Sequence, residues 1–227
     1  MEDMKATNLE ILYEDNHVIV VVKPCNVPSQ ADSSHDVDML SLIKEYIKKK
    51  YNKPGNVYLG LVHRLDRPVG GIMVFAKTSK AASRLSKSMN TGEFKKTYVA
   101  VVCGILDKKE DTLIDYIKKD DKFNSIITDK EHGKYAELHY KVLEEKEDTS
   151  LVLIDLKTGR HHQIRIQFKN IGHPLYGDQR YGVEDKKQIA LFATKLSFVH
   201  PTKKEWMHFS KRPNYGKFLD FYDKNKD

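Results

Sequence analysis

The sequence predicts an α+β fold with a mostly antiparallel β-sheet, and two observations support this class. Predicted strands outnumber predicted helices and do not alternate with them regularly, as the strands of a doubly wound parallel sheet would. Several segments that alternate apolar and polar residues are separated by short turn signals, which is typical of antiparallel hairpins. The 227 residues, of which 40% are hydrophobic, suffice for one large domain or two small ones with a real core.

The first half of the chain is predicted to form a hairpin, two helices and two further strands. Asp15 and Asn16 give a turn signal between two apolar stretches, which favours the hairpin. Apolar residues recur at helical spacing after residue 38, and Ser79 is of a type that caps helices. The expected ranges are 9–23 for the hairpin, 38–51 and 80–90 for the helices, and 57–62 and 72–76 for the strands.

The second half is predicted to form strands around one helix. Residues 161–171 are ambiguous, because Ile164, Ile166 and Phe168 alternate as in a strand, whereas Ile164, Phe168 and Ile171 share one face of a helix. Gly172 is well placed as a C-terminal cap, so we expect a helix. The remaining ranges are 97–102 and 189–200 for strands, 136–143 and 151–156 for two alternating strands that pair, and 107–133 for a hairpin-like insertion.

Basic residues exceed acidic ones, since 39 Lys and Arg stand against 32 Asp and Glu and give a net charge of +7. This excess favours a polyanion such as a nucleic acid as the partner. Lysines cluster at residues 48–50 and 95–96. Each cluster also fits a solvated surface or the charged end of a helix, so charge by itself leaves both interpretations open.

Several features argue against a membrane or secreted protein. The mean hydropathy is −0.59, and no apolar run approaches the roughly 18 residues that a spanning helix needs. Residues 1–7 are polar and partly acidic, so no signal peptide is expected. Cys25 and Cys103 are too few for a disulfide framework and each adjoins an apolar run, so buried thiols and a cytoplasmic location are expected.

The most informative motif lies in residues 61–71, where Asp66 stands among the three bases His63, Arg64 and Arg67. Opposite charges favour an ionised carboxylate. Such a group suits a nucleophile, a weak general base or an electrostatic partner for a developing cation. A proline and two glycines follow and predict a tight turn that a ligand backbone can approach. Without such neighbours, an Asp at a strand end is most often a turn former or a helix cap.

A second basic stretch runs from Thr158 to Arg165. Its two adjacent histidines invite a metal site, but on a helix their side chains diverge, and no further ligand stands at the required spacing. The stretch is therefore predicted to supply donors for phosphates or base edges, with His161 and Arg165 on one helix face. The alternative is that Arg165 pairs with a structural acid.

A third motif places Lys95 and Lys96 just before Tyr98 in a predicted strand. A tyrosine in a strand is usually a core residue, but beside a basic site its ring can stack on a base, which contributes roughly 1–3 kcal/mol. The Gly- and Pro-containing loop 172–178 lacks the spacing of a phosphate-binding loop, and no dinucleotide-binding fingerprint occurs. No nucleotide cofactor is therefore expected.

Taken in order, these motifs resemble the RluA-type pseudouridine synthases in their short form, which has no S4 domain. The motifs that carry the resemblance are His63–Asp66 with its glycine turn, Lys96–Ala100, Thr158–Arg165, and the shorter Leu12–Asp15, Lys23–Pro28, Gly172–Asp178 and Phe198–Pro201. The chain departs from the family pattern at Asn26, where Gly is common, and at Pro68-Val69, which replace part of a Thr-Ser-Gly turn.

The resemblance implies a pseudouridine synthase fold, in which flanking helices accompany a mixed, mostly antiparallel sheet with a central active-site cleft. The expected limits are 1–8 for an N-terminal tail, 9–212 for a single catalytic domain and 213–227 for a C-terminal tail. It further implies an isomerase that converts specific uridines of ribosomal or transfer RNA to pseudouridine, with no metal or organic cofactor. A cytoplasmic monomer with no membrane partner is expected.

Carried over residue by residue, Asp66 is the catalytic aspartate, Tyr98 is the tyrosine placed against the target base, and Arg165 pairs with the aspartate. Arg64 matches the arginine implicated in opening the RNA and holding the site left by the flipped base. We expect further RNA contacts from the other basic residues of the motifs, His63, Arg67, Lys95, Lys96, Arg160 and His162. His63 and Arg67 are also expected to support the Asp66 loop.

Three other interpretations stay open at this point. A non-catalytic RNA-binding protein on the same scaffold would be expected to lack or alter the acid. A metal-dependent nuclease would use Asp66, His162 and His173, although such enzymes usually need several acids at the metal. Asp66 could also belong to a structural ion pair in a protein without a catalytic role.

Overall fold

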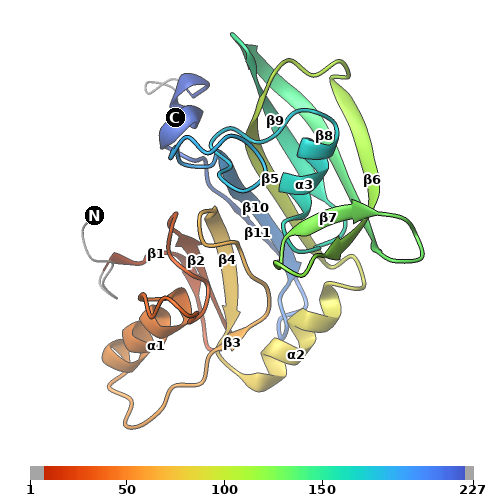
Figure 1. The fold of residues 1–227 in the computed structure, drawn as a ribbon. Helices are drawn as coiled ribbons and strands as arrows, with labels where there is room; N and C mark the ends of the chain where they lie inside the picture. The colour runs from red at the N-terminus through yellow and green to blue at the C-terminus, as the bar shows by residue number, and fades with distance from the viewer. Residues whose placement is uncertain (1–7, 223–227) are drawn as a thin grey trace. The chain divides into compact units, whose positions relative to one another are not determined.

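The computed structural model describes residues 8–222, so of the predicted N-terminal tail only Asn8 is described. The chain forms two compact units (Figure 1). The first unit holds the residues up to Lys95 together with Lys195–Lys211. The second holds Lys96–Thr194 together with the residues from Arg212 onward. The expected catalytic-domain limits at residues 9 and 212 stay predictions.

The first unit is built on antiparallel strand pairs. The predicted hairpin is confirmed, because β1 (Glu10–Glu14) pairs with β2 (Val18–Lys23). Strand β2 pairs in turn with β4 (Gly70–Ala76). The next strand is β10 (Leu191–Val199), whose residues from Lys195 onward belong to this unit. Strand β11 (Trp206–Ser210) pairs with the end of β10. The strand predicted at 57–62 is only two residues long, since β3 (Gly60–Leu61) makes just two pairs with β4.

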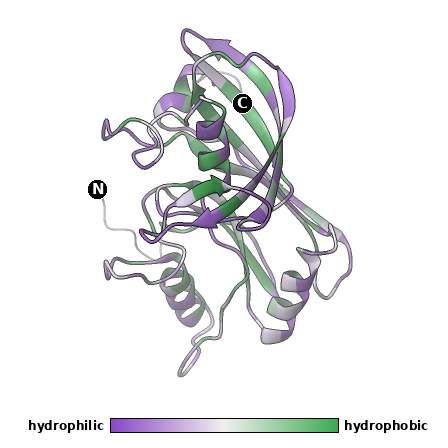
Figure 2. Ribbon diagram, turned by 45° about the vertical axis from the view of Figure 1, so that its right-hand side comes forward, coloured by the Kyte–Doolittle hydropathy of each residue, from purple (hydrophilic) through white to green (hydrophobic). Residues whose placement is uncertain are grey.

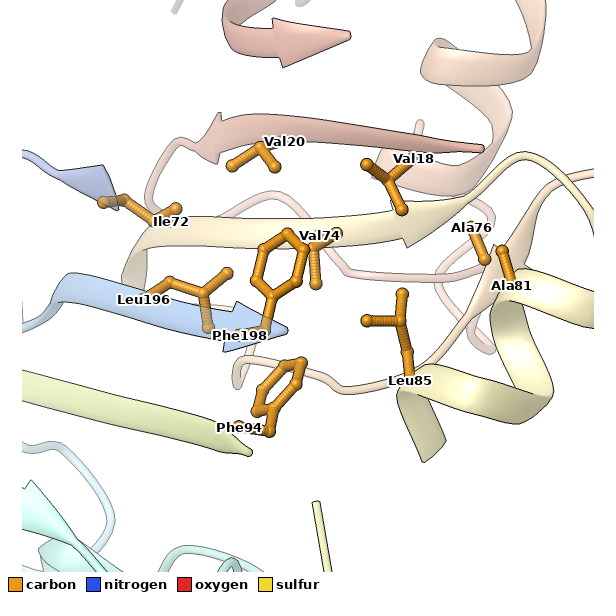
Figure 3. Packing of buried hydrophobic residues seen from close by; sticks show 10 residues of the cluster. All are labelled: Val18, Val20, Ile72, Val74, Ala76, Ala81, Leu85, Phe94, Leu196 and Phe198. Atoms are coloured by element: carbon orange, nitrogen blue, oxygen red, sulfur yellow. The ribbon is translucent and has the colours of Figure 1, made fainter. Parts of the chain in front are cut away.

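One hydrophobic cluster packs the helix α2 (Ser79–Ser88) onto these strands. Phe94 and Phe198 stack in it with ring centroids 6.0 Å apart, and Leu85 points toward them from α2 (Figure 3). The other buried members are Val18, Val20, Ile72, Val74, Ala76, Ala81 and Leu196. The predicted cap was wrong by one residue. Thr78 caps α2, because its hydroxyl accepts a hydrogen bond from the N–H of Ala81 at 3.1 Å.

The helix α1 (Met39–Lys50) confirms the amphipathic helix predicted at 38–51. Asp38 caps it by accepting a hydrogen bond from the N–H of Ser41 at 3.1 Å. Its apolar face is buried through Met39, Leu42, Ile43 and Ile47.

Part of the lysine run at the end of α1 serves ion pairs of the first unit itself. Glu14, at the end of β1, binds Lys50 at 2.7 Å and Lys77 at 2.7 Å. Burial raises the pKa of Glu14, but Lys50, Lys77 and the Tyr51 hydroxyl outweigh it and lower the pKa to about 2. Lys49 pairs with Glu45 on the helix surface. For Lys49 and Lys50, the structure thus favours the interpretation as a solvated, ion-paired surface.

The second unit is an antiparallel sheet in the order β5-β9-β8-β6-β7. The insertion predicted at 107–133 is the β6–β7 hairpin, and β6 also pairs with β8, which makes the insertion part of the sheet. Figure 2 shows the alternation of apolar and polar residues as changes between green and purple along these strands. The strands are β5 (Phe94–Cys103), β6 (Glu110–Lys119), β7 (Ser125–Thr128), β8 (Lys134–Lys146) and β9 (Thr149–Leu156).

The ambiguous segment 161–171 contains a helix, α3 (Gln163–Asn170), as preferred from the sequence. Gly172 has φ +83° and ends it with a Schellman motif, in which the N–H of Gly172 donates to the Lys169 carbonyl and that of His173 to the Phe168 carbonyl, both at 3.0 Å. His161 precedes α3, so the prediction that it shares a helix face with Arg165 was wrong.

Three smaller findings complete the fold. Gly216–Asp220, in the predicted C-terminal tail, forms a short 3-10 helix whose Phe218 is buried. Cys25 and Cys103 are half-buried rather than buried as expected, because Cys25 lies in the turn after β2 and Cys103 is the last residue of β5. Among residues 8–222, no helix has the length and apolar character needed to cross a membrane.

Candidate active site

The backbone around Asp66 is fixed at three points. On one side, the Leu65 N–H donates to the Ser29 hydroxyl at 3.2 Å, and that hydroxyl donates to the Leu65 carbonyl at 2.8 Å. On the other side, the ammonium of Lys23 donates to the Arg67 carbonyl at 3.0 Å. The Asp66 carbonyl itself accepts a hydrogen bond from the N–H of Val69 at 3.0 Å, which closes the predicted turn. The half-buried Asp66 side chain therefore stands on a loop with little backbone freedom.

Lys23 is the buried support of this loop. It is fully buried and also donates to the carbonyls of Pro24 at 3.0 Å and Val27 at 2.6 Å. Burial lowers the pKa of Lys23 to about 7, although the neighbouring Cys25 and Asp66 act in the opposite direction. Three carbonyl acceptors match the three N–H groups of an ammonium, whereas a neutral amine has only two.

Two of the three bases beside Asp66 are engaged in the structure of the first unit. His63 is 8% exposed, and its Nε2 accepts a hydrogen bond from the N–H of Val74 at 3.1 Å. The Arg67 guanidinium forms ion pairs with Asp32 at 2.9 Å and with Asp36 at 2.5 Å. Hydrogen bonds from Ser34 and from Arg67 lower the pKa of Asp32 to about 2. These contacts match the predicted support of the loop.

Arg64 differs from its neighbours. Its side chain is exposed, and within residues 8–222 its guanidinium makes no hydrogen bond or ion pair. A charged group that the protein does not use internally is available to an external anion such as a phosphate.

Tyr98 and Arg165, the other two predicted catalytic residues, belong to the second unit. Tyr98 lies in β5 opposite Ile154 of β9 and is 6% exposed. Such burial fits a core tyrosine, and it also fits a ring that forms one wall of a site. The prediction of base stacking is not tested by the geometry of this unit.

Arg165 makes a bidentate ion pair with Asp178. Its Nε donates to Asp178 Oδ2 at 2.7 Å and its Nη2 donates to Asp178 Oδ1 at 2.6 Å, with both side chains buried. Burial raises the pKa of Asp178, but Arg165 and the N–H groups of Tyr181 and Arg180 outweigh it and hold the pKa below its usual value. Asp178 is therefore the structural acid that the alternative interpretation requires. This ion pair uses two of the five N–H donors of the guanidinium, and the pairing of Arg165 with Asp66 stays a prediction.

The loop before α3 is organised by Gln163, which is buried. Its side-chain oxygen accepts hydrogen bonds from the Thr158 hydroxyl at 2.8 Å and from the Arg160 N–H at 3.0 Å. Its amide nitrogen donates to the Glu137 carbonyl at 3.1 Å. The exposed Arg160 is held in addition by a hydrogen bond from its Nε to the Tyr135 carbonyl at 2.8 Å. The loop that carries the predicted donors is thus rigidly fastened to β8.

The structure brings Lys96 to this loop. A Cβ on Gly159 would lie 3.1 Å from the Lys96 ammonium, so the absence of a side chain there leaves room for the lysine. Burial lowers the pKa of Lys96. Two motifs that are about sixty residues apart in sequence therefore lie side by side in the second unit.

The two histidines of the motif stack on each other, with ring centroids 3.6 Å apart. This is possible because His162 adopts a left-handed conformation with φ 52° at the start of α3, where a helix would have separated the rings. His162 Nδ1 lies 2.8 Å from the Tyr181 hydroxyl, and His161 Nδ1 lies 3.1 Å from the Ser125 hydroxyl. Within the described part of the chain, no group of three or more His, Cys, Asp or Glu is arranged to hold a metal ion.

Three functional residues were missed at the level of the sequence, namely Lys23, Gln163 and Asp178. Each lies inside a motif that carried the family resemblance, and this was the signal that could have found them. Their roles depend on partners such as Arg67 and Arg165 that no local pattern identifies.

Comparison with known proteins agrees with these motifs. The model of the family described as RNA pseudouridylate synthase matches residues 17–170. The chain belongs to this family. Its sequence is 33% identical to that of a ribosomal large subunit pseudouridine synthase C of Buchnera aphidicola, over 95% of this chain and 68% of the relative. It is 37% identical to the uncharacterized RNA pseudouridine synthase YjbO of Bacillus subtilis, over 88% of this chain and 71% of the relative.

Solved structures support the same assignment. The human RNA pseudouridylate synthase domain containing 1 protein is 25% identical, with a TM-score of 0.76 over 94% of this chain and 86% of that chain. The RluA-type resemblance and the α+β pseudouridine synthase fold are therefore confirmed. The chain is an isomerase that acts on RNA.

Proposed function

We propose that this pseudouridine synthase modifies uridines of ribosomal or transfer RNA and that Asp66 is its catalytic residue. The observation that carries the proposal is the fixation of the backbone at residues 65–67, where Ser29 binds Leu65, Val69 binds Asp66 and Lys23 binds Arg67. A carboxylate that must meet one sugar carbon of a flipped nucleotide requires such positioning. Ribosomal RNA is the first candidate, because the Buchnera aphidicola relative is named for the large ribosomal subunit.

The reaction breaks the N1–C1′ bond of uridine, turns the uracil and joins its C5 to C1′, so no electron is gained or lost. Asp66 either attacks C1′ or removes a proton from C2′, and both roles require the ionised carboxylate. Arg165, held by Asp178, is proposed to pair with Asp66 in the assembled site and to keep it charged and aimed. Loss of the C5 proton needs a base, and no described residue is assigned to this role.

Tyr98 is proposed to form the flat wall against which the flipped uracil rests. Arg64 is proposed to occupy the gap that the uridine leaves in the RNA, since the first unit makes no internal use of its guanidinium within residues 8–222. Further phosphate contacts are assigned to Lys95, Lys96, Arg160 and His162. His63 and Arg67 act as supports of the loop, because a backbone N–H and two carboxylates engage them.

Tritium release from RNA labelled at C5 of uridine tests the function. We expect Asp66→Asn to abolish release while RNA binding persists, because the amide keeps the shape of the side chain but removes its charge. Asp121→Asn, at an exposed turn of the second unit, is the matched control and is expected to behave as the wild type. Turnover by Asp66→Asn at the wild-type rate would refute the catalytic assignment.

Further measurements complete the proposal. Release that survives a chelator is expected and argues against a metal-dependent reaction. Mapping of pseudouridines in RNA from a deletion strain identifies the target and separates ribosomal from transfer RNA. Sedimentation and fractionation test the expected cytoplasmic monomer.

A further inference from the structure

Strand β11 has an aromatic face that the core of the first unit does not require. Met207 and Phe209 point toward the hydrophobic cluster and pack against it. The alternate residues Trp206, His208 and Ser210 are exposed, as the two-residue period of a strand demands. The Trp206 side chain is 43% exposed. Burial therefore explains Met207 and Phe209 but gives no reason for a tryptophan on the opposite face.

The exposed rings are ordered and lie among cations. Those of Trp206 and His208 are nearly parallel, with an interplanar angle of 12° and centroids 5.9 Å apart. The Lys95 ammonium lies 5.4 Å from the centroid of the Trp206 ring. His208 Nδ1 is 3.0 Å from the hydroxyl of Ser197 on the neighbouring strand. The exposed Lys195 lies opposite Ser210 in the same register and so on the same face.

The charges around these rings favour an anionic partner. Lys95 and Lys195 contribute two positive charges to the face itself. The adjacent acid, Glu205, faces Lys203 at 3.9 Å, which offsets its negative charge. A flat aromatic surface flanked by lysines is the combination that binds single-stranded nucleic acid, because bases stack on the rings while phosphates meet the ammonium groups.

We propose that Lys95, Lys195, Trp206 and His208, together called the β11 surface, bind a single-stranded segment of the substrate RNA outside the flipped uridine. The proposal rests on the proposed function in that RNA is the substrate, but the surface is distinct from the residues assigned to the chemistry. A base stacks on Trp206, and Lys95 holds the ring from one side while it contacts a phosphate. The surface contributes affinity and register and takes no part in bond breaking.

Trp206 is the single tryptophan of the chain, so its fluorescence reports on this surface alone. The probe is an oligouridylate of about 20 nucleotides, long enough to cover the site size of one such binding surface. We expect saturable quenching of the Trp206 emission, which weakens as salt is added because counterions are released on binding. An absence of quenching at concentrations where a labelled oligouridylate binds the protein would overturn the proposal.

Variants test the surface independently, with binding measured by anisotropy of the labelled oligouridylate. Trp206→Ala is expected to weaken binding about tenfold, and Trp206→Phe, which keeps a ring and the packing of the strand, less than about threefold. Lys95→Gln is expected to weaken binding about threefold. It is also expected to reduce the slope of the logarithm of the affinity against the logarithm of the salt concentration by nearly one. Equal affinity of Trp206→Ala and the wild type would contradict the proposal.

The chain offers a matched control in the second unit. Phe123 is 70% exposed and has the Lys119 ammonium 5.9 Å from its ring centroid, which repeats the chemical combination elsewhere. Phe123→Ala is expected to bind the oligouridylate within about twofold of the wild type, because within residues 8–222 no second ring stacks beside Phe123 as His208 does beside Trp206. A loss as large as that of Trp206→Ala would mean that any exposed ring binds RNA, and the proposal would fail.

Failure of this proposal and failure of the proposed function are distinguishable. Tritium release by the wild type without quenching of Trp206 leaves the function intact and refutes the β11 surface. Quenching and a tenfold loss in Trp206→Ala without tritium release from any RNA supports the surface and refutes the function. In an active enzyme, Trp206→Ala is expected to raise KM for long RNA with kcat unchanged, because binding is lost equally in ground and transition states.

Discussion

The ammonium of Lys23 donates a hydrogen bond to the carbonyl oxygen of Arg67, the residue that follows Asp66, at 3.0 Å. A fully buried lysine from the end of β2 thereby fixes a loop that lies 44 residues further along the chain. The same ammonium holds the carbonyls of Pro24 and Val27, so the Lys23–Pro28 motif and the Asp66 motif act as one structural element.

Lys23→Met is expected to lower kcat roughly tenfold or more while the affinity for RNA changes little, because the loop loses its anchor and Asp66 its position. Tritium release gives kcat, and anisotropy with labelled RNA gives the affinity. Lys53→Met, at an exposed turn after α1, is the control and is expected to leave both values unchanged. An unchanged kcat in Lys23→Met would show that the loop does not need this support.

The pKa of Lys23, lowered to about 7 from 10.5, predicts a pH dependence of stability. Between these two values the unfolded chain binds more protons than the folded one, so the stability of the folded state rises with pH. The wild type is therefore expected to gain stability relative to Lys23→Met from about pH 7 toward pH 10. Urea unfolding of both proteins over this range measures the difference, which would stay flat if the ammonium kept its ordinary pKa.

Asp178→Asn is expected to destabilise the protein by about 3–5 kcal/mol, because it leaves Arg165 buried without its counter-charge. Turnover is expected to fall as well, since Arg165 loses the contact that aims it. Because the pKa of Asp178 is lowered, the carboxylate stabilises the fold above its usual pKa and loses this effect as the pH falls below that value. The stability difference between variant and wild type is thus expected to shrink in acid, which urea unfolding can follow.

Tyr98→Phe is expected to keep most of the turnover, because the ring that we propose to face the base is retained, whereas Tyr98→Ala removes it. Tritium release from the two variants is the measurement. A loss in Tyr98→Phe as large as that in Tyr98→Ala would mean that the hydroxyl takes part in the reaction. Removal of the C5 proton, to which no residue is assigned, would then be the step to examine.

The local elements of the fold were readable from the sequence because their causes are local. Alternation predicted the β1–β2 hairpin and the β8–β9 pair, helical spacing predicted α1, and Gly172 marked the end of α3. The failures were also local in origin. The αL conformation of His162 delays the start of α3, so His161 lies outside the helix. Hydrophobic periodicity does not reveal a single residue in the left-handed conformation.

The resemblance assigned different roles to the three bases around Asp66, and the tertiary structure added the partners that engage two of them. Arg67 is bound by Asp32 and Asp36 from a loop over thirty residues earlier, and His63 by the backbone of β4. Likewise, Asp15 of the first family motif meets His200 of the last at 2.9 Å across 185 residues.

The sequence by itself therefore determined the class of fold and the family, and it predicted the residues that we propose to carry the chemistry. It could do so because hydrophobic periodicity, turn residues and motif order are properties of contiguous segments. Only the tertiary structure identified the partners themselves, namely the carboxylates that bind Arg67, the backbone N–H that binds His63 and the acid that holds Arg165. For the buried Lys23, Arg165 and Asp178 the physical reason is burial, since a buried charge must find a partner wherever the fold brings one near.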